Sequence, residues 1–456
     1  MPKLITLDLG SHAVKAITWR VVARGQVELE QRLEHPVPQD GTPATLAHRL
    51  AALDLLLQDN PSLKPTSADI VLLAWPSSEA AFHRVTVPFS EAAQIDQTLP
   101  STIESEVPFE LDDMVLAWRM AEQSPGRNDL LVALARKARV REWLTALAER
   151  GIDPSAVHID ADLYGPWGGA AAVTDDDAYD APPAPLVAVI DVGHAHTTVS
   201  VVRGATVQFA RSINVGGWGF TRAIADVMQI PFVQAEDVKH GLPTGSIDED
   251  PTVLAGDGGA RSGYSSWPAA VREKVDGVMG LLLAEIRSTL IKAEDTLQAE
   301  VASVRITGGG SRIAELRAYL HTDLGVPLED AVDPRGAETP PEFALAQALA
   351  GASSGGGFVD LRVKELAFRG RTDLVRSALG YGLSGAAFFS FAALLMFGWQ
   401  YRNLVVEQAS AEEAVRAIVT RSFPEIPADS LDTMSKAEAL MAEFTQDAVT
   451  RADVLG

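Results

Sequence analysis

Two short turns, each with an aspartate two residues before a glycine, carry the residues of this chain best suited to chemistry. Asp8 and Gly10 lie in LDLGSHAVK, and Asp191 and Gly193 lie in IDVGHAHTTVSV. A glycine in a tight turn lets backbone N–H groups face a phosphate, because no Cβ stands in the way. An aspartate in each turn can hold Mg²⁺ through water beside the same phosphates. Together the two turns predict a site for a phosphate chain and its Mg²⁺.

A third turn, Gly308–Gly310, follows a strand-like run and precedes a helical pattern. It could pack against a nucleoside, or against a phosphate at a helix amino terminus. Each piece also has a simpler interpretation, since Asp-x-Gly is often only a turn and a glycine triplet is often only a loop. The ordered set of three is more specific. The candidates in the first two turns are Asp8, Gly10, Ser11, Lys15, Asp191, Gly193, Thr197 and Thr198.

Alternating strand-like and helix-like runs surround these turns and must position them. Apolar spacing in ATLAHRLAALDLLLQ predicts a helix, and ADIVLLAWP predicts a buried strand. The acidic, proline-rich segment 173–185 predicts an exposed loop between two lobes. After it the opening pattern of strand, Asp-x-Gly turn and strand returns. We therefore predict an α/β protein of two lobes built from duplicated units, with a polar, glycine-rich loop at 242–267.

The composition excludes several classes of protein. The chain has 456 residues and a net charge of -23, which argues against a nucleic-acid binder because such a protein needs a basic face to neutralise phosphates. Cysteine is absent, so disulfides, Fe–S clusters and cysteine-type zinc sites are excluded. The nine histidines form no H-E-x-x-H motif. The amino terminus has Asp8 where a secretory signal would need its apolar core, which predicts a first domain in the cytoplasm.

A run without charged side chains extends from residue 377 to residue 401. It contains a literal G-x-G-x-x-G at Gly380, Gly382 and Gly385, but a dinucleotide-binding loop needs a strand before it and a helix after it. A helix needs roughly 20 apolar residues to cross the hydrocarbon core of a membrane. The alternative, a buried core helix, is less favoured because core helices are rarely this long without charge. The run therefore predicts one transmembrane helix.

The flanking charges predict how this helix is oriented. Basic residues precede it and acidic residues follow it, so the positive-inside rule places residues before 377 in the cytoplasm and those after 401 in the periplasm of a bacterial inner membrane. Small residues recur every four positions and share one helix face, on which a second membrane helix could pack closely. Small residues are also common in membrane helices generally. The predicted packing face consists of Ala378, Gly382, Ala386 and Ser390.

The three glycine-rich turns resemble a known set of motifs. LDLGSHAVK, IDVGHAHTTVSV and ITGGGSRIAEL are similar, in that order, to the two phosphate motifs and the adenosine motif of the actin and FtsA superfamily of ATPases. STIESEVPFELDDMVLAW and SINVGGWGFTRAIADVMQIPFVQAEDVKHG resemble the PilM family of type IV pili, and this resemblance covers about residues 1–352. An actin-like domain, a basic linker at 353–376 and one membrane helix resemble protein L of the type II secretion system, GspL. We take GspL as the first choice.

The resemblance implies a role for each candidate residue. Asp8 and Asp191 would lie on the Mg²⁺ side of a bound ATP, and Glu236 and Lys239 would reach its ribose or adenine. His194 and His196 depart from the small residues usual in the second phosphate motif. Glu104 or Glu106 could orient a water, although a solvated helix face is the preferred interpretation. The residues expected along the phosphates and the adenosine are Gly10, Ser11, Lys15, Gly193, Thr197, Gly308, Gly309 and Gly310.

The GspL resemblance also implies a scaffold rather than an enzyme. Its cytoplasmic domain would bind ATP without turnover and dock the secretion ATPase, a GspE-like protein. Its membrane and periplasmic parts would contact GspM-like platform proteins and a second copy of the chain. The resemblance implies a ferredoxin-like periplasmic domain after the membrane helix, but residues 402–456 have helical spacing and no convincing strands, so they hold at most the approach to such a domain. Either the domain is truncated here or the chain departs from the family. The alternatives are a membrane-tethered actin-like ATPase or filament former of a type IV pilus or FtsA-like machine, and a sugar kinase, which shares the fold.

Overall fold

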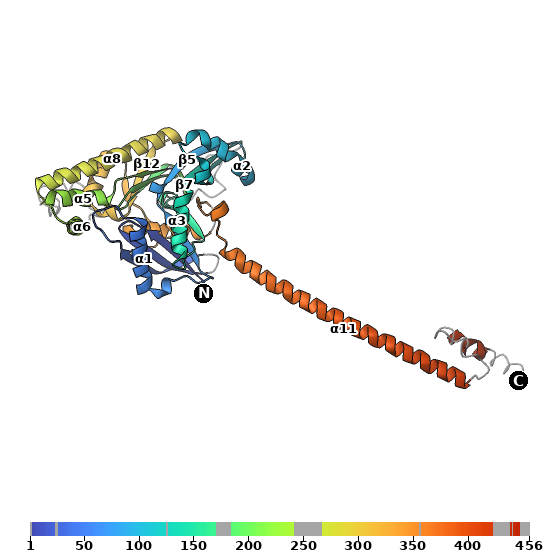
Figure 1. Cartoon of the computed structure of the whole chain (residues 1–456). Helices are drawn as coiled ribbons and strands as arrows, with labels where there is room; N and C mark the ends of the chain where they lie inside the picture. The colour runs from blue at the N-terminus through green and yellow to red at the C-terminus, as the bar shows by residue number, and fades with distance from the viewer. Residues whose placement is uncertain are drawn as a thin grey trace. The chain divides into compact units, whose positions relative to one another are not determined.

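The computed structural model describes residues 2–22, 26–124, 126–169, 184–240, 267–354, 357–422, 438–439 and 441–446, with the side chains of 314, 354 and 371–387 outside this description. The chain divides into two compact units, residues 1–370 and residues 371–456 (Figure 1). The first unit contains two lobes and a smaller subdomain. The predicted loops at 173–185 and 242–267 lie almost entirely outside the described residues.

The first lobe is a five-stranded sheet in the order β3-β2-β1-β4-β8. The hairpin strands pair antiparallel, whereas β4 pairs parallel with both β1 and β8. Strand β1 is buried on both faces because helices and the second lobe cover the sheet, which explains its nearly unbroken apolar run. The elements are β1 (Lys3–Leu9), β2 (Ala13–Val21), β3 (Val27–Pro36), α1 (Leu46–Asp59), β4 (Ile70–Trp75), α3 (Lys137–Ala148) and β8 (Ala156–Ile159).

The second lobe repeats this plan with the strand order β11-β10-β9-β12-β13. Again a hairpin pairs antiparallel, and β12 pairs parallel with both β9 and β13. The predicted duplication of an α/β unit is therefore confirmed. The elements are β9 (Leu186–Val192), β10 (Thr197–Arg203), β11 (Thr206–Ile213), α5 (Gly217–Met228), α6 (Phe232–His240), α8 (Ala269–Leu297), β12 (Val301–Thr307), α9 (Ala314–Leu324) and β13 (Leu328–Asp330). In Figure 1, α8 runs along the top of the unit beside α5.

A three-stranded antiparallel sheet, β5-β7-β6, forms the subdomain with its own apolar core. It consists of β5 (Ala80–Val87), α2 (Ala92–Ile103), β6 (Met114–Ser124) and β7 (Arg127–Arg136). This sheet was not predicted as separate from the first lobe. Glu104 and Glu106 belong to the subdomain, where both are exposed, in agreement with the solvated face preferred for them.

A buried ion pair joins these parts. Arg119 of β6 binds Asp162 of the short helix α4 (Asp160–Leu163) through Nε and Oδ1 at 2.8 Å, and its Nη2 donates to the carbonyl of Val207 in β11 at 2.8 Å. The backbone N–H of Val359 donates to the other carboxylate oxygen, Oδ2, at 2.7 Å. The pair thus contacts the subdomain, both lobes and the segment that precedes residue 370. Another short helix, α10 (Ala344–Ala348), packs nearby in the core between the lobes.

The segment before residue 370 belongs to the first unit. Asp360 accepts a hydrogen bond from the N–H of Val157 at 2.9 Å, and Arg362 pairs with Asp153 at 2.6 Å. Val359, Leu361 and Leu366 pack in the core of the first lobe. Over its described residues 357–370, the segment predicted as a linker at 353–376 is therefore packed against the lobe.

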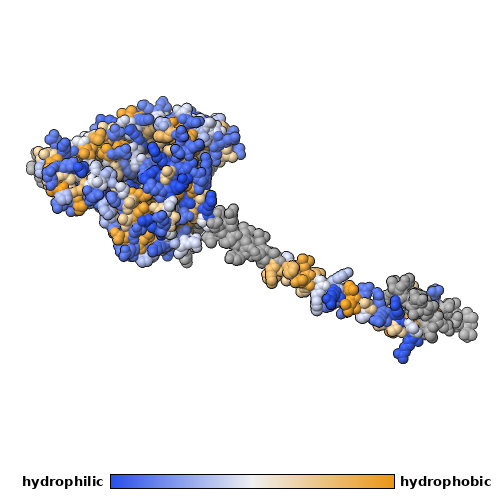
Figure 2. All heavy atoms as spheres, in the orientation of Figure 1, coloured by the Kyte–Doolittle hydropathy of each residue, from blue (hydrophilic) through white to orange (hydrophobic). Residues whose placement is uncertain are grey.

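The second unit contains the long helix α11 (Gly370–Ser422). Gly380, Gly382 and Gly385 lie within it, which agrees with excluding their motif as a strand–turn–helix nucleotide loop. Along α11 the apolar side chains from Phe388 to Phe397 are exposed (orange in Figure 2). Among the described residues, no helix has a stretch long and apolar enough to span a membrane. Most of the predicted packing face, Ala378, Gly382 and Ala386, falls outside the described side chains, whereas Ser390 is exposed.

Candidate functional site

A cleft of about 340 Å³ lies between the lobes, within the size range of small-molecule sites. Its walls come from the β1–β2 turn, the β9–β10 turn, helix α6 and the turn after β12. The structure thus brings together nearly all residues that the sequence marked as candidates. Those that line the cleft are Asp8, Gly10, Ser11, Lys15, Asp191, Gly193, Glu236, Lys239, Gly308, Gly309 and Gly310.

Thr197 is the predicted residue that does not line this cleft. It is buried, and its hydroxyl donates to the carbonyl of Val215 at 2.7 Å. Its neighbour Thr198 faces the cleft instead, with its Oγ1 at 3.1 Å from Oγ of Ser77. Adjacent residues of a strand point to opposite faces, so only one of the two threonines can face a ligand.

The glycines of the first two turns are required by close approach of the backbone. A Cβ on Gly10 would lie 2.6 Å from the carbonyl oxygen of Ala13, and one on Gly193 would lie 2.8 Å from that of His196. The same contact, with the residue three positions further on, recurs in both turns. This local repeat is the structural counterpart of the repeated Asp-x-Gly pattern.

The third turn packs directly against the second. Gly308 has a φ of +83°, and a Cβ there would lie 2.1 Å from Oδ1 of Asp191. A Cβ on Gly310 would lie 2.4 Å from Cγ1 of Val192. Gly309, by contrast, faces open space. The triplet therefore closes one side of the cleft against the end of β9.

Three aspartates converge in the cleft, and the sequence reasoning found two of them. Asp8 lies 3.5 Å from Nζ of Lys15, and Asp191 accepts a hydrogen bond from the hydroxyl of Tyr164 at 2.6 Å. Desolvation by burial raises the pKa of Asp191 to about 6; the Tyr164 hydrogen bond opposes this, and the neighbouring aspartate charges add to it. Asp160, which directly follows β8, is the third.

Asp160 was missed because no glycine marks its turn. Its Oδ1 accepts the backbone N–H of Ser77 at 3.0 Å, and its Oδ2 lies 3.2 Å from Nε2 of His196. Burial acts to lower the pKa of His196, but the hydrogen bond to Asp160 and its charge outweigh this, so that the pKa is raised. His196 therefore supports a cleft carboxylate. The available signal was an aspartate at the end of an apolar run, as in both other turns.

A second missed residue is Arg49 of α1, a cation that lines the cleft. Its Nη1 donates to the carbonyl of Leu9 at 3.1 Å, which holds it beside the first turn. Burial lowers the pKa of Arg49. A helical arginine far from any motif carries no sequence signal for this position.

Glu236 of α6 is the centre of a polar cluster at one side of the cleft. Lys239 lies 2.7 Å from its Oε1 and His240 lies 3.2 Å from the same oxygen, while the hydroxyl of Thr221 donates to Oε2. Burial acts to raise the pKa of Glu236, but these hydrogen bonds and the Lys239 charge hold it well below its usual range. The predicted pair Glu236 and Lys239 thus forms an ion pair that faces both glycine turns.

The two-lobed architecture and this cleft define the class of the protein. The described chain superposes on the PilM–PilN type IV pilus biogenesis complex with a TM-score of 0.58, at 22% identity, over 77% of this chain and 98% of that chain. It has the two-lobed fold of actin-like ATPases. The cytoplasmic domain of EpsL, an inner-membrane component of the type II secretion system of Vibrio cholerae, gives a TM-score of 0.31 at 17% identity, over 50% of this chain and 77% of that chain.

Comparison with known sequences identifies the family within this class of actin-like proteins. The family model of type IV pilus assembly protein PilM matches residues 6–249, and that of cell division protein FtsA matches residues 188–348. The chain belongs to the family of type IV pilus assembly protein PilM. The cell shape-determining protein MreB of Pasteurella multocida (strain Pm70) is 26% identical over 162 residues, which are 32% of this chain and 46% of that relative. The chain thus spans less than half the length of this curated relative.

These comparisons confirm the predicted PilM-like, actin-fold domain. The more specific prediction, that the chain is the GspL protein of a type II secretion system, remains a proposal.

Proposed function

We propose that this protein is an ATP-binding platform of a type IV pilus or type II secretion machine, with a GspL-like role in the latter. The observation that carries the proposal is the cleft itself, in which two duplicated Asp-x-Gly turns meet three aspartates. In the fold of actin-like ATPases, a cleft between the lobes is where a nucleotide would be held.

The residues of the cleft fit a nucleotide and its Mg²⁺. Backbone N–H groups of the turns at Gly10 and Gly193 would face the phosphates, and Glu236 with Lys239 would face the ribose or adenine. Asp8, Asp160 and Asp191 offer the oxygen ligands that Mg²⁺ prefers. When bound, Mg²⁺ would neutralise charge on the phosphates. Lys15 and Arg49 supply further positive charge from the chain.

Binding without turnover is the preferred form of this proposal, because each cleft aspartate already has a partner in the described structure. Hydrolysis is the alternative, and one observation favours it. The pKa of Asp191 is raised to about 6, so this carboxylate is a stronger base than an ordinary aspartate while it remains ionised at pH 7.

Binding of a fluorescent ATP analogue to the full chain in the presence of Mg²⁺ tests the proposal. Asp8→Ala should weaken binding at least about ten-fold, since a Mg²⁺-side carboxylate is lost. Asp226→Ala, on the exposed face of α5, is the matched control and should bind like the wild type. A folded wild type that binds no analogue would refute nucleotide binding. A steady-state ATPase rate that Asp191→Asn abolishes would instead favour the enzyme.

For partners, we propose an inner-membrane platform protein and the secretion ATPase of the same machine. The support is membership in the PilM family, together with the PilM–PilN complex as a relative of the same fold. GspE-like and GspM-like proteins are the corresponding partners in a type II system, and a second copy of the chain is a third. A pull-down with the full chain in detergent should retain the amino-terminal region of the secretion ATPase. Its absence with folded protein would argue against the docking role.

The proposed membrane anchor is the segment 377–401 of α11, which would place residues before 377 in the cytoplasm of a bacterium. The support is the uncharged run together with large apolar side chains that are 60–74% exposed from Phe388 to Phe397. Alkaline extraction of membranes should leave the full chain in the membrane pellet, and Leu394→Arg with Leu395→Arg should release it. Release of the unaltered chain would contradict the anchor.

A further inference from the structure

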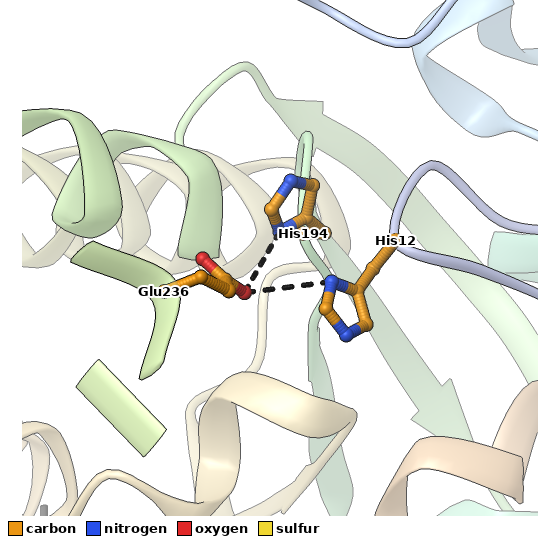
Figure 3. A group of neighbouring side chains, drawn as sticks. All are labelled: His12, His194 and Glu236. Atoms are coloured by element: carbon orange, nitrogen blue, oxygen red, sulfur yellow. Dashed lines mark ion pairs between the residues drawn. The ribbon is translucent and has the colours of Figure 1, made fainter. Parts of the chain in front are cut away.

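Three side chains from separate parts of the chain converge on one point at the edge of the cleft (Figure 3). His12 comes from the β1–β2 turn of the first lobe, and His194 from the β9–β10 turn of the second lobe. Glu236 approaches both from α6, with its Oε1 at 3.4 Å from Nδ1 of His12 and at 3.9 Å from Nδ1 of His194. The three candidate ligand atoms lie within 4.8 Å of one another.

The protonation of His194 follows from its hydrogen bonds. Nε2 of Gln39 donates to the carbonyls of Ser11 at 3.0 Å and Val37 at 2.9 Å, so the amide oxygen of Gln39 is left as an acceptor. That oxygen lies 3.2 Å from Nε2 of His194, which must therefore carry the ring proton. The lone pair of Nδ1 then points toward Glu236. A partner that fixes the tautomer of a histidine in this way is typical of metal sites.

His12 offers the second ring nitrogen of the cluster. Its Nδ1 is buried and makes no hydrogen bond in the described part of the chain. Two ring nitrogens, Nδ1 of His12 and Nδ1 of His194, thus lie near one carboxylate oxygen, Oε1 of Glu236. A cation at their centre would satisfy all three.

We propose that His12, His194 and Glu236 form a site for a transition-metal dication of the Zn²⁺ class. Two imidazoles and one carboxylate with an open fourth position are a common zinc ligand set. Zinc bonds of about 2.0 Å in a tetrahedral arrangement separate ligand atoms by about 3.3 Å. The separation of 3.4 Å from His12 to Glu236 already matches, whereas the 3.9 Å from His194 to Glu236 and the separation of the two histidine atoms, which is within 4.8 Å, shorten when the metal binds.

The cations already at Glu236 can accommodate this metal. Lys239 now shares Oε1 at 2.7 Å, but it also donates to Oγ1 of Thr221 at 2.9 Å and lies 3.4 Å from the carbonyl of Gly217. It therefore keeps two partners when the metal takes Oε1. His240, whose Nε2 lies 3.2 Å from Oε1, is largely exposed and can turn toward solvent when the metal takes that oxygen.

Such a metal would join the two lobes, because His12 belongs to one and the other two ligands to the other. The metal would also bind the Glu236 carboxylate, which the proposed nucleotide site uses. Metal and nucleotide would then exclude each other, and the metal would keep the cleft closed. The metal site itself does not depend on nucleotide binding, since its ligands are all side chains of this chain.

Zn²⁺ titration of the full chain, without an affinity tag and without nucleotide, tests this site. The wild type should bind one Zn²⁺ by competition with a chromophoric chelator, and Co²⁺ in its place should give the intense visible absorption of four-coordinate nitrogen and oxygen ligation. His12→Ala should weaken Zn²⁺ binding at least about ten-fold. His321→Ala, exposed on α9, is the matched control and should bind as the wild type does.

Gln39→Ala keeps all three ligands and removes only the hydrogen-bond partner of His194, so it should still weaken Zn²⁺ binding about ten-fold or more. It is the second test variant if His12→Ala does not fold. Asp191→Asn separates this proposal from the nucleotide site, because it should impair nucleotide binding and leave Zn²⁺ binding intact. Zn²⁺ affinity that is the same in the wild type, His12→Ala and Gln39→Ala would overturn the proposal, as would no binding by the folded wild type.

Discussion

Asp191→Asn should make the protein more stable near neutral pH and worse at binding a nucleotide. Folding raises the pKa of Asp191 from its ordinary 3.8 to about 6. An acid of this kind binds more protons in the folded state between these two pH values, so the free energy of unfolding falls as the pH rises through this interval. Above about pH 6 the folded protein bears the full cost of an ionised, desolvated carboxylate. An uncharged asparagine removes that cost and can still accept the hydrogen bond from Tyr164.

The size of this gain follows from the same two pKa values. The interval of about 2.2 pH units, at 1.36 kcal/mol for each, corresponds to a gain of up to about 3 kcal/mol at pH 7.5. The gain should shrink steadily below pH 6 and be nearly absent at pH 4, where the wild-type carboxyl is largely protonated. Urea unfolding of both proteins at pH 7.5 and pH 4 measures it, with Asp226→Asn as the exposed control. Equal stability of Asp191→Asn and wild type at pH 7.5 would refute the reasoning.

Two further predictions concern packing. Gly308→Ala should lower the free energy of unfolding by at least about 2 kcal/mol, because the backbone has a φ of +83° and the new Cβ would meet the carboxylate at the end of β9. Gly309 faces open space, so Gly309→Ala should change the free energy of unfolding by less than about 0.5 kcal/mol in the same urea titration. Arg119→Met should cost about 3–5 kcal/mol in thermal or urea unfolding, because it leaves Asp162 buried without its ion pair. Arg222→Met, which breaks an exposed pair on α5, should cost less than about 0.5 kcal/mol, and similar losses in both variants would contradict the buried-pair argument.

The duplicated lobes and most of the cleft could be predicted because their signal is local. A strand, an aspartate, a glycine and a second strand occupy a few adjacent residues, and the same glycine contact recurs at Gly10 and Gly193. Arg49 reaches the cleft only through tertiary packing, so no short pattern marks it, and Asp160 ends an apolar run but lacks the glycine that marks the other two turns. Thr197 shows another reason why the sequence alone did not define the whole cleft. The resemblance favoured Thr197 over the adjacent Thr198, but the strand register turns Thr198 toward the cleft and Thr197 away from it.

His194 shows that a departure from a motif can be informative. For His194, the sequence showed only that it replaces a small residue that is usual in the second phosphate motif. Its relation to His12 and Glu236, which are far away in the chain, depends on the closure of one lobe on the other. Side-chain clusters across a cleft are therefore beyond pattern reasoning on a single sequence.

The buried pair of Arg119 and Asp162 has a mechanical consequence. Four parts of the first unit are bound to these two side chains: the subdomain through β6, the first lobe through α4, the second lobe through Val207 and the final segment through Val359. The pair is buried, whereas the cleft is open to solvent, so we expect the lobes to separate at the cleft by turning about this pair. A partner that pulls on the subdomain or on the segment before residue 370 would therefore rotate the lobes about this pair and change the width of the cleft.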